Sequence, residues 1–148
     1  MAHEWSATTT INRPIDQVFA FLADGTNDTK FSPRVQEIKK LTDGPPGVGT
    51  VYSSAVKDAG LKSSREFKLS DFEQPTKIRW TELSKNAITV PDGGYDLEPA
   101  GDGATRMTIS NTFEGHGFGK VLLPLATRAA KKDADAFAGR IKAAVEAS

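Results

Sequence analysis

The chain has 148 residues, with 19 Lys and Arg against 19 Asp and Glu, two histidines and no cysteine. This length is typical of one domain, and the balanced charge argues against a nucleic-acid-binding surface. The lack of cysteine excludes disulfides, iron–sulfur clusters and thiolate zinc sites, and it fits the cytoplasm. No basic and apolar leader opens the sequence, and no apolar run approaches the ~20 residues of a membrane helix. We therefore expect a single cytoplasmic domain over residues 1–148, without a membrane span.

The first part of the chain predicts one strand followed by one or two short helices. Residues 4–11 alternate between apolar and polar side chains, as in a half-buried strand. Pro14 can open a helix, because the first turn does not use its missing N–H, and apolar residues follow at helical spacing up to Leu22. This helix is expected to end near Asp24. Residues 26–34 are expected to form a second short helix or an irregular turn.

The middle of the chain predicts a series of short strands. Segments with alternating or β-branched residues are separated by Gly and Pro, which break regular structure. The expected strands are residues 35–41, 48–57, 63–72, 77–83, 86–90 with 94–98, and 105–114. Neighbouring strands joined by such short turns pair in antiparallel fashion.

Three details of this region are less regular. Residues 58–60 predict a hairpin turn, and residues 91–93 interrupt one strand with a bulge or bend. In the strand at 48–57, the face that carries Ser53 and the face that carries Tyr52 are equally plausible as the inner one.

The end of the chain predicts one long helix. Apolar residues recur at steps of three and four, which places them on one face of a helix. This stripe consists of Leu123, Ala126, Ala130, Ala134, Phe137, Ile141 and Val145. A series of antiparallel strands closed by one helix is an α+β arrangement, not a doubly wound parallel one. We expect the sheet to wrap around this helix and to enclose more volume than the alanine-rich stripe can fill.

Three segments give the chain a family resemblance: the helix entry at 14–24, the strand and turn at 94–107, and the helix end at 141–146. They resemble the START-like (SRPBCC) or helix-grip superfamily, and most closely its polyketide cyclase/dehydrase branch. The resemblance implies a curved antiparallel sheet of about six to seven strands around the C-terminal helix, with an internal cavity between them. One departure is Phe31, which stands where the family often has Trp.

The same resemblance implies a function class. Members bind lipids, sterols, polyketides or hormones, and some cyclise or dehydrate aromatic polyketides. We therefore expect the cavity to bind a small hydrophobic, lipid-, aromatic- or polyketide-like molecule. One alternative is a polyketide cyclase, aromatase or dehydratase that acts on such a ligand, and another is the protein-interaction role of stress-related relatives. No catalytic set is carried over, so enzymatic activity stays open, and no cofactor is expected.

Motifs with a specific chemistry are scarce. His3 and His116 lack the spacing of metal ligands, so no metal site is expected. The sequence has no Gly-x-Ser-x-Gly elbow. The glycine-rich run at 115–119 leads into a helix but lacks the lysine-hydroxyl ending of a phosphate-binding loop. A flexible hinge over the mouth of the pocket is the better interpretation.

Polar residues on strand faces that otherwise point inward are the candidate site. Because a buried polar group is costly unless it is paired, such residues tend to line a wet or ligand-filled space. Arg65 and Glu82 would orient a carbonyl or hydroxyl of the ligand, or else lie at strand ends, reach solvent or pair with each other. Tyr95 and Asn111 would add hydrogen bonds. The candidate cavity residues are Arg65, Phe67, Ile78, Trp80, Glu82, Tyr95, Met107, Ile109, Asn111 and Phe137.

Overall fold

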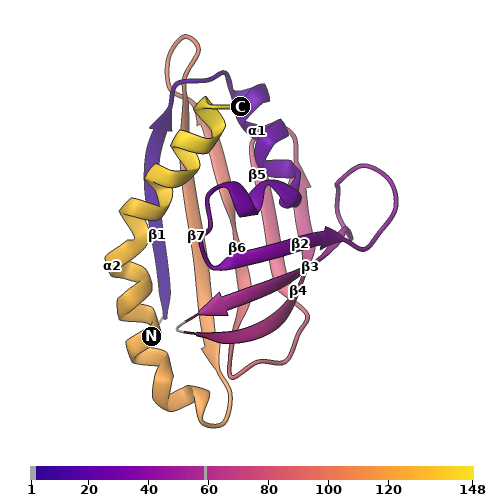
Figure 1. Ribbon diagram of the computed structural model, residues 1–148. Helices are drawn as coiled ribbons and strands as arrows, with labels where there is room; N and C mark the ends of the chain where they lie inside the picture. Colours follow the sequence, from indigo (N-terminus) through magenta and orange to yellow (C-terminus); the bar gives the residue numbers. More distant parts are fainter. Residues whose placement is uncertain (1–2, 59) are drawn as a thin grey trace.

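The computed structural model describes residues 3–58 and 60–148. In this part of the chain, seven strands form one sheet, accompanied by two α-helices and a short 3-10 helix (Figure 1). In chain order, the elements are β1 Glu4–Ile11, α1 Ile15–Ala23, η1 Gly25–Lys30, β2 Val35–Lys40, β3 Val51–Asp58, β4 Leu61–Glu73, β5 Lys77–Glu82, β6 Ile88–Pro99, β7 Thr105–Gly115 and α2 Gly119–Glu146.

The sheet is antiparallel throughout and curved, with the strand order β1-β7-β6-β5-β4-β3-β2. Helix α2 packs along β1 and β7, and η1 packs against β2 at the opposite edge of the sheet (Figure 1). The predicted α+β helix-grip fold is therefore confirmed. Because the two edges of the curved sheet are covered by different elements, space is left between those elements and the central strands.

The order of the predicted elements is also confirmed, with local differences. The segments at 86–90 and 94–98 belong to one strand, β6, whose pairing with β7 shifts register between Thr89 and Asp92. The expected interruption is thus a bulge within a strand and not a break between two strands. Pro14 immediately precedes the first helical residue, Ile15, instead of lying within the first turn.

Two further expectations concern β3. The turn predicted at 58–60 includes Ala59, which lies outside the described residues. The inner face of β3 is the one that carries Tyr52 and Ser54, which are 4% and 6% exposed, whereas Ala55 is exposed. Ser53 therefore lies on the outer face.

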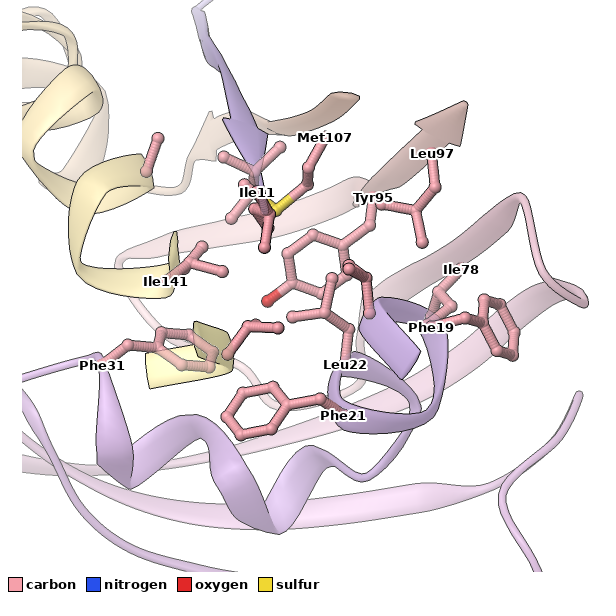
Figure 2. Packing of buried hydrophobic residues seen from close by; sticks show 14 of the residues in the cluster. Ile11, Phe19, Phe21, Leu22, Phe31, Ile78, Tyr95, Leu97, Met107 and Ile141 are labelled. Carbon is pink, nitrogen blue, oxygen red and sulfur yellow. The ribbon is translucent and has the colours of Figure 1, made fainter. Parts of the chain in front are cut away.

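A solid core fills one end of the space between the sheet and α2. Ile11, Met107 and Ile141 have no exposed surface, and Figure 2 shows them beside one another. Met107 was predicted to lie on the cavity wall, but this prediction is wrong. Its neighbours on β1 and α2 close around it, so its side chain belongs to the packed core.

The C-terminal end of α2 is tied to the turn between β1 and α1. The backbone N–H of Asn12 donates to a Glu146 carboxylate oxygen at 2.8 Å, and the Arg13 guanidinium donates to the Glu146 carbonyl at 2.5 Å. These contacts hold the helix across the sheet at the filled end.

Candidate functional site

A cavity of about 630 Å³ lies between the inner face of the sheet, the α1–η1 segment and α2. Most of its wall is aromatic or aliphatic. The large apolar side chains on the wall are Trp5, Leu22, Phe31, Ile38, Tyr52, Phe67, Leu69, Ile78, Trp80, Tyr95, Ile109, Phe113 and Phe137. Ligand pockets in proteins have similar volumes and a similarly apolar lining with few polar groups.

Most of the candidate residues lie on this wall. Arg65, Phe67, Ile78, Trp80, Tyr95, Ile109, Asn111 and Phe137 line the cavity. Two candidates do not line it: Met107, which is in the core, and Glu82, which lies behind Arg65. The sheet thus brings together side chains from β4, β5, β6 and β7 that alternate inward along each strand.

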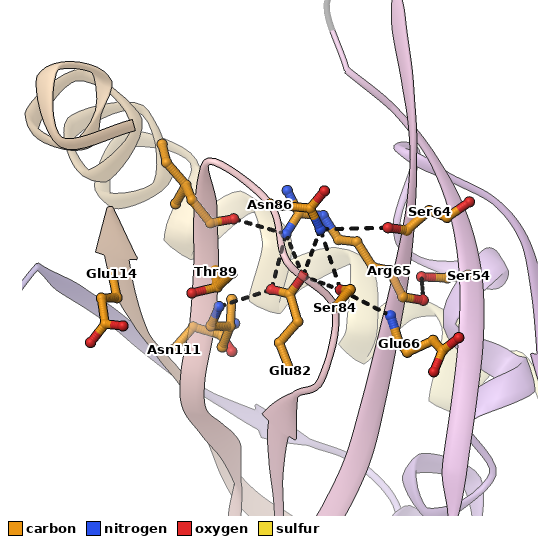
Figure 3. A network of polar contacts seen from close by, with 12 residues as sticks. Ser54, Ser64, Arg65, Glu66, Glu82, Ser84, Asn86, Thr89, Asn111 and Glu114 are labelled. Carbon is orange, nitrogen blue, oxygen red and sulfur yellow. Dashed lines mark hydrogen bonds and ion pairs between the residues drawn. The ribbon is translucent and has the colours of Figure 1, made fainter. Parts of the chain in front are cut away.

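Glu82 is the centre of a hydrogen-bond network at the end of β5 (Figure 3). Its carboxylate accepts from Arg65 Nη1 at 3.0 and 3.1 Å and from the Val90 N–H at 2.9 Å. Ser84 Oγ and Asn86 Nδ2 also donate to it, at 2.5 and 2.9 Å. The Glu82 side chain is fully buried, so this carboxylate has its charge compensated by protein groups. The pairing alternative is the arrangement observed, and the prediction that Glu82 faces the cavity is wrong.

Arg65 connects this network to the cavity. Its Nη1 also donates to the Ile88 carbonyl at 3.1 Å, and its side chain is 26% exposed. Within the described part of the chain, Nε and Nη2 have no hydrogen-bond partner. Glu82 therefore positions a guanidinium that keeps free donors at the cavity wall.

Trp80 and Asn111 form a second polar pair on the wall. Trp80 Nε1 donates to Asn111 Oδ1 at 2.9 Å, although the two residues come from β5 and β7. Between them lies Gly93 of β6, where an added Cβ would stand 2.0 Å from Asn111 Oδ1 and 2.4 Å from Trp80 Nε1. The bond can cross β6 only because this position has no side chain.

Asp28 is a polar wall residue that the sequence did not indicate. It lies in η1, is half-buried, and its carboxyl has no hydrogen-bond partner among the described residues. Burial, with a smaller contribution from the Asp24 charge, raises the pKa of Asp28 from 3.8 to about 7. Near neutral pH the carboxyl is therefore able both to donate and to accept a proton.

Tyr95 and Tyr52 lie within electrostatic reach of Asp28. Burial, and secondarily the Asp28 charge, raises the pKa of the Tyr95 phenol well above its ordinary value. Burial also raises the pKa of Tyr52, with smaller contributions from the charges of Asp24 and Asp28 and an opposing one from a backbone hydrogen bond at Gly25. Tyr52 Oη donates to the Ala23 carbonyl at 3.3 Å. The Tyr95 hydroxyl has no partner among the described residues, and Figure 2 shows its ring projecting from β6 toward the side of Leu22 and Phe31. Both phenols thus stay neutral at ordinary pH and can donate.

Beside α2 the cavity wall reaches the protein surface. Asp133 and Arg140 line the cavity, yet their side chains are 40% and 35% exposed. Arg140 donates to Asp133 at 2.8 Å and to the Phe31 carbonyl at 3.2 Å, and the hydrogen bond from Arg140 lowers the pKa of Asp133. These contacts join α2 to the end of η1 at the edge of the cavity.

The polar wall residues missed from the sequence share a cause. Asp28, Arg34, Asp133 and Arg140 come from η1, the segment after it, and α2, not from the strands. The pattern of inward-facing strand positions cannot indicate them, and no motif marks them. Tyr52 and Ser54 were missed because the two faces of β3 were not distinguished.

The glycine-rich run does not lie over the cavity. Gly115, Gly117 and Gly119 are absent from the cavity wall, and a Cβ on Gly119 would stand 1.9 Å from the Ala87 carbonyl oxygen. The expected hinge over the mouth is therefore wrong, and Gly115 and Gly119 instead allow close packing at the start of α2. Over residues 3–58 and 60–148, no three His, Cys, Asp or Glu side chains gather in a way that would hold a metal ion. Neither described α-helix combines the length and the hydropathy needed to cross a bilayer.

The chain was compared with known proteins. The comparison with curated proteins gives no match. Among solved structures, a START superfamily protein from Mycobacterium smegmatis superposes with a TM-score of 0.79 at 14% identity, over 97% of each chain. The ZhuI aromatase/cyclase from Streptomyces sp. R1128 gives a TM-score of 0.76 at 17% identity, over 97% of this chain and 93% of the other. Ara h 8.0201 gives 0.69 at 23% identity, over 100% of both chains.

At these identities, the structural likenesses establish the fold alone. The family model described as "Polyketide cyclase / dehydrase and lipid transport" matches residues 2–146, which is nearly the whole chain. The protein therefore belongs to the polyketide cyclase / dehydrase and lipid transport family.

Proposed function

We propose that this protein binds a small, largely apolar ligand with an aromatic or lipid-like body in the cavity between the curved sheet and α2. The observation that carries the proposal is a cavity of about 630 Å³ whose wall is mainly aromatic and aliphatic. Protein interiors are normally close-packed, so an apolar cavity of this size lowers the stability of the fold. A bound apolar ligand would offset this loss. The lack of cysteine fits the cytoplasmic location that we propose for it.

Unused hydrogen-bonding groups on the wall would orient this ligand. Arg65 Nε and Nη2 and the Tyr95 hydroxyl have no partners among the described residues, and Asn111 Oδ1 already accepts from Trp80. Asn111 Oδ1 is an acceptor, whereas the Arg65 nitrogens and the Tyr95 hydroxyl are donors on residues that line the cavity. A carbonyl or hydroxyl oxygen on the ligand would satisfy them. Arg65 and Asn111 therefore stand as proposed ligand contacts, while Glu82 has the role of holding Arg65 in place.

The proposal can be tested by fluorescence titration with the neutral probe N-phenyl-1-naphthylamine, together with native mass spectrometry for a co-purified molecule. Val56 lines the cavity, whereas its neighbour Ala55 is exposed on the outer face of β3. We expect Val56→Trp to weaken probe binding about tenfold or more by filling space, and Ala55→Trp to leave it unchanged. Equal affinity for both variants, or no binding by the unaltered protein, would contradict the proposal.

A second candidate function is catalysis, favoured by Asp28 and Tyr95 on the same wall. In an aldol cyclisation of a poly-β-ketone, the Asp28 carboxylate would take a proton from an α-carbon. The Tyr95 hydroxyl would donate a hydrogen bond to the carbonyl oxygen that gains negative charge as the carbon–carbon bond forms. The protonated Asp28 would return its proton to the resulting alkoxide, and loss of water would then remove this hydroxyl together with a second proton from the α-carbon. Loss of turnover in Asp28→Asn with unchanged ligand affinity would favour this enzyme over a carrier.

A further inference from the structure

The first turns of α2 have one buried face and one exposed face that is apolar. Gly119, Leu123 and Thr127 are buried against the rest of the protein. On the outer face, Phe118, Val121, Leu122 and Leu125 are 73%, 67%, 39% and 66% exposed. Their spacing of i, i+3, i+4 and i+7 gathers them into one stripe, which we name the α2 patch. Figure 1 shows these turns at the lower end of the molecule, next to the end of β7.

The fold itself does not require this patch. The other large exposed apolar residues in the described part of the chain, Leu41, Val48 and Leu83, are scattered over loops. Isolated exposed side chains of this kind are ordinary, whereas a contiguous patch marks an interaction site. The patch also lies outside the cavity wall, so the proposed ligand does not cover it.

The charged residues of the first turns of α2 are all cations, although Glu114 at the end of β7 lies 3.4 Å from the His116 ring. Residues 115–132 contain Lys120, Arg128, Lys131 and Lys132 but neither Asp nor Glu, although the whole chain is balanced at 19 against 19. All four cations are exposed, and none forms an ion pair with any described carboxylate. Arg128 and Lys132 continue the stripe, three and seven positions after Leu125. The surface therefore combines exposed apolar side chains with a local excess of positive charge.

The α2 patch is held in a fixed position by the loop before β6. The His116 N–H donates to the Ala87 carbonyl at 2.8 Å, and the His116 ring lies 2.9 Å from Thr89 Oγ1. Gly119 packs so closely on Ala87 that no side chain fits between them. Because these contacts clamp the start of α2, the exposed stripe cannot turn inward to bury itself.

We infer that the α2 patch docks on an anionic lipid surface. Phe118, Val121 and Leu125 enter the boundary between headgroups and acyl chains, while the surrounding lysines and arginine contact the negative headgroups. Charge also favours a lipid surface over a second copy of this chain. A two-fold interface through the α2 patch would bring its four cations against the same four cations of the partner copy.

The test is co-sedimentation of the full chain with vesicles at low salt. One set consists of phosphatidylcholine alone, and the other also contains about one-third phosphatidylglycerol. We expect binding to the anionic vesicles that is about tenfold or more tighter than to the neutral ones, and that weakens as salt is raised.

Two pairs of matched variants separate the contributions. Phe118→Ser with Leu125→Ser should weaken binding about tenfold or more. Leu41→Ser with Val48→Ser, which alters side chains 53% and 68% exposed elsewhere, should not. Arg128→Gln with Lys132→Gln should reduce the preference for anionic vesicles, whereas Lys57→Gln with Lys62→Gln, also exposed, should leave it unchanged.

The inference is overturned if neither vesicle binds, if both bind equally, or if the patch variant and its control behave alike. A different occupant is also a contradicting outcome. In that case the protein does not bind vesicles, and Phe118→Ser with Leu125→Ser abolishes its self-association or its binding to an acidic protein. Since the α2 patch is outside the cavity, binding of the naphthylamine probe should persist in the patch variant. Failure at the vesicle surface therefore leaves the proposed cavity function standing.

Discussion

The polar side chains around the cavity differ in how their hydrogen-bonding capacity is used. Glu82 receives donors from four residues and is fully buried, so its role is structural. In Arg65, by contrast, only Nη1 donates hydrogen bonds to protein groups among the described residues. The Asp28 carboxyl and the Tyr95 hydroxyl have no hydrogen-bond partner within residues 3–58 and 60–148. The proposed ligand would therefore meet polar groups that the protein holds in place but that keep unused hydrogen-bonding capacity.

Replacing Glu82 by Gln should be costly. The change removes the negative charge that compensates Arg65 and leaves donors in the network without a full acceptor, so we expect the free energy of unfolding to fall by about 2 kcal/mol. Glu98→Gln is the control, because Glu98 accepts from Arg106 at 2.7 Å but both side chains are more than half exposed. It should cost less than about 0.5 kcal/mol. If urea denaturation gives Glu82→Gln and Glu98→Gln a similar loss in the free energy of unfolding, this prediction is wrong.

Replacing Asp28 by Asn should change how stability depends on pH. Its pKa is about 7 in the native state against 3.8 ordinarily, so the native state holds this proton more tightly than the unfolded chain. This group therefore makes the free energy of unfolding fall as pH rises from about 4 to about 7. Asp28→Asn lacks this loss. The free energy of unfolding of the variant minus that of the unaltered protein should therefore be at least about 1 kcal/mol larger at pH 8 than at pH 4. A difference that is the same at both pH values would rule out the raised pKa.

At the scale of elements, β6 is shaped by its neighbours. Gly93 lies beneath the bond between Trp80 and Asn111, and a Cβ on Gly94 would stand 2.3 Å from the Ile78 carbonyl oxygen. In the sequence, Gly93 belongs to the run at 91–93 that is expected to interrupt the strand, because glycine disfavours strands when no contact requires it. Here the two glycines let β5, β6 and β7 approach closely and bring two wall residues into contact. The same segment also contains the register shift before Asp92.

Gly93→Ala should therefore separate Trp80 from Asn111. We expect a loss of about 1–3 kcal/mol in the free energy of unfolding, since the new methyl group overlaps both partners of the bond. Gly139→Ala is the matched change in α2, where a Cβ would meet no atom within 4 Å. A helical alanine should instead add about 0.5–1 kcal/mol. Thermal or urea unfolding that gives both changes the same sign would contradict the argument.

At the scale of the whole molecule, one end of the space inside the sheet is filled and the rest is open. Ile11, Met107 and Ile141 pack solidly where the end of α2 is tied to the β1–α1 turn. Toward η1 and β2 the layers diverge around the cavity. The packed end stabilises the fold, whereas the open part lowers its stability, which is consistent with the proposed ligand-binding function. Helix α2 takes part in the core and the cavity, and its first turns form the proposed docking surface.

Local periodicity in the sequence was enough to determine the kind and order of the elements. Alternation along residues 105–114 put Ile109 and Asn111 on one face, and steps of three and four put Phe137 and Ile141 on one stripe. Both patterns follow from the backbone geometry of strands and helices, which each segment carries by itself. The resemblance to the START-like superfamily then joined these elements into the right fold.

Only the tertiary structure decided which inward-facing residues border empty space. Met107 and Ile109 share a face of β7, but one lies in the core and the other on the cavity wall. The difference comes from the curvature of the sheet and from what α2 and η1 cover. These depend on contacts between residues far apart in the sequence. For the same reason Asp28 became a wall residue only once η1 was placed across the sheet, since periodicity records the direction of a side chain and not what lies opposite it.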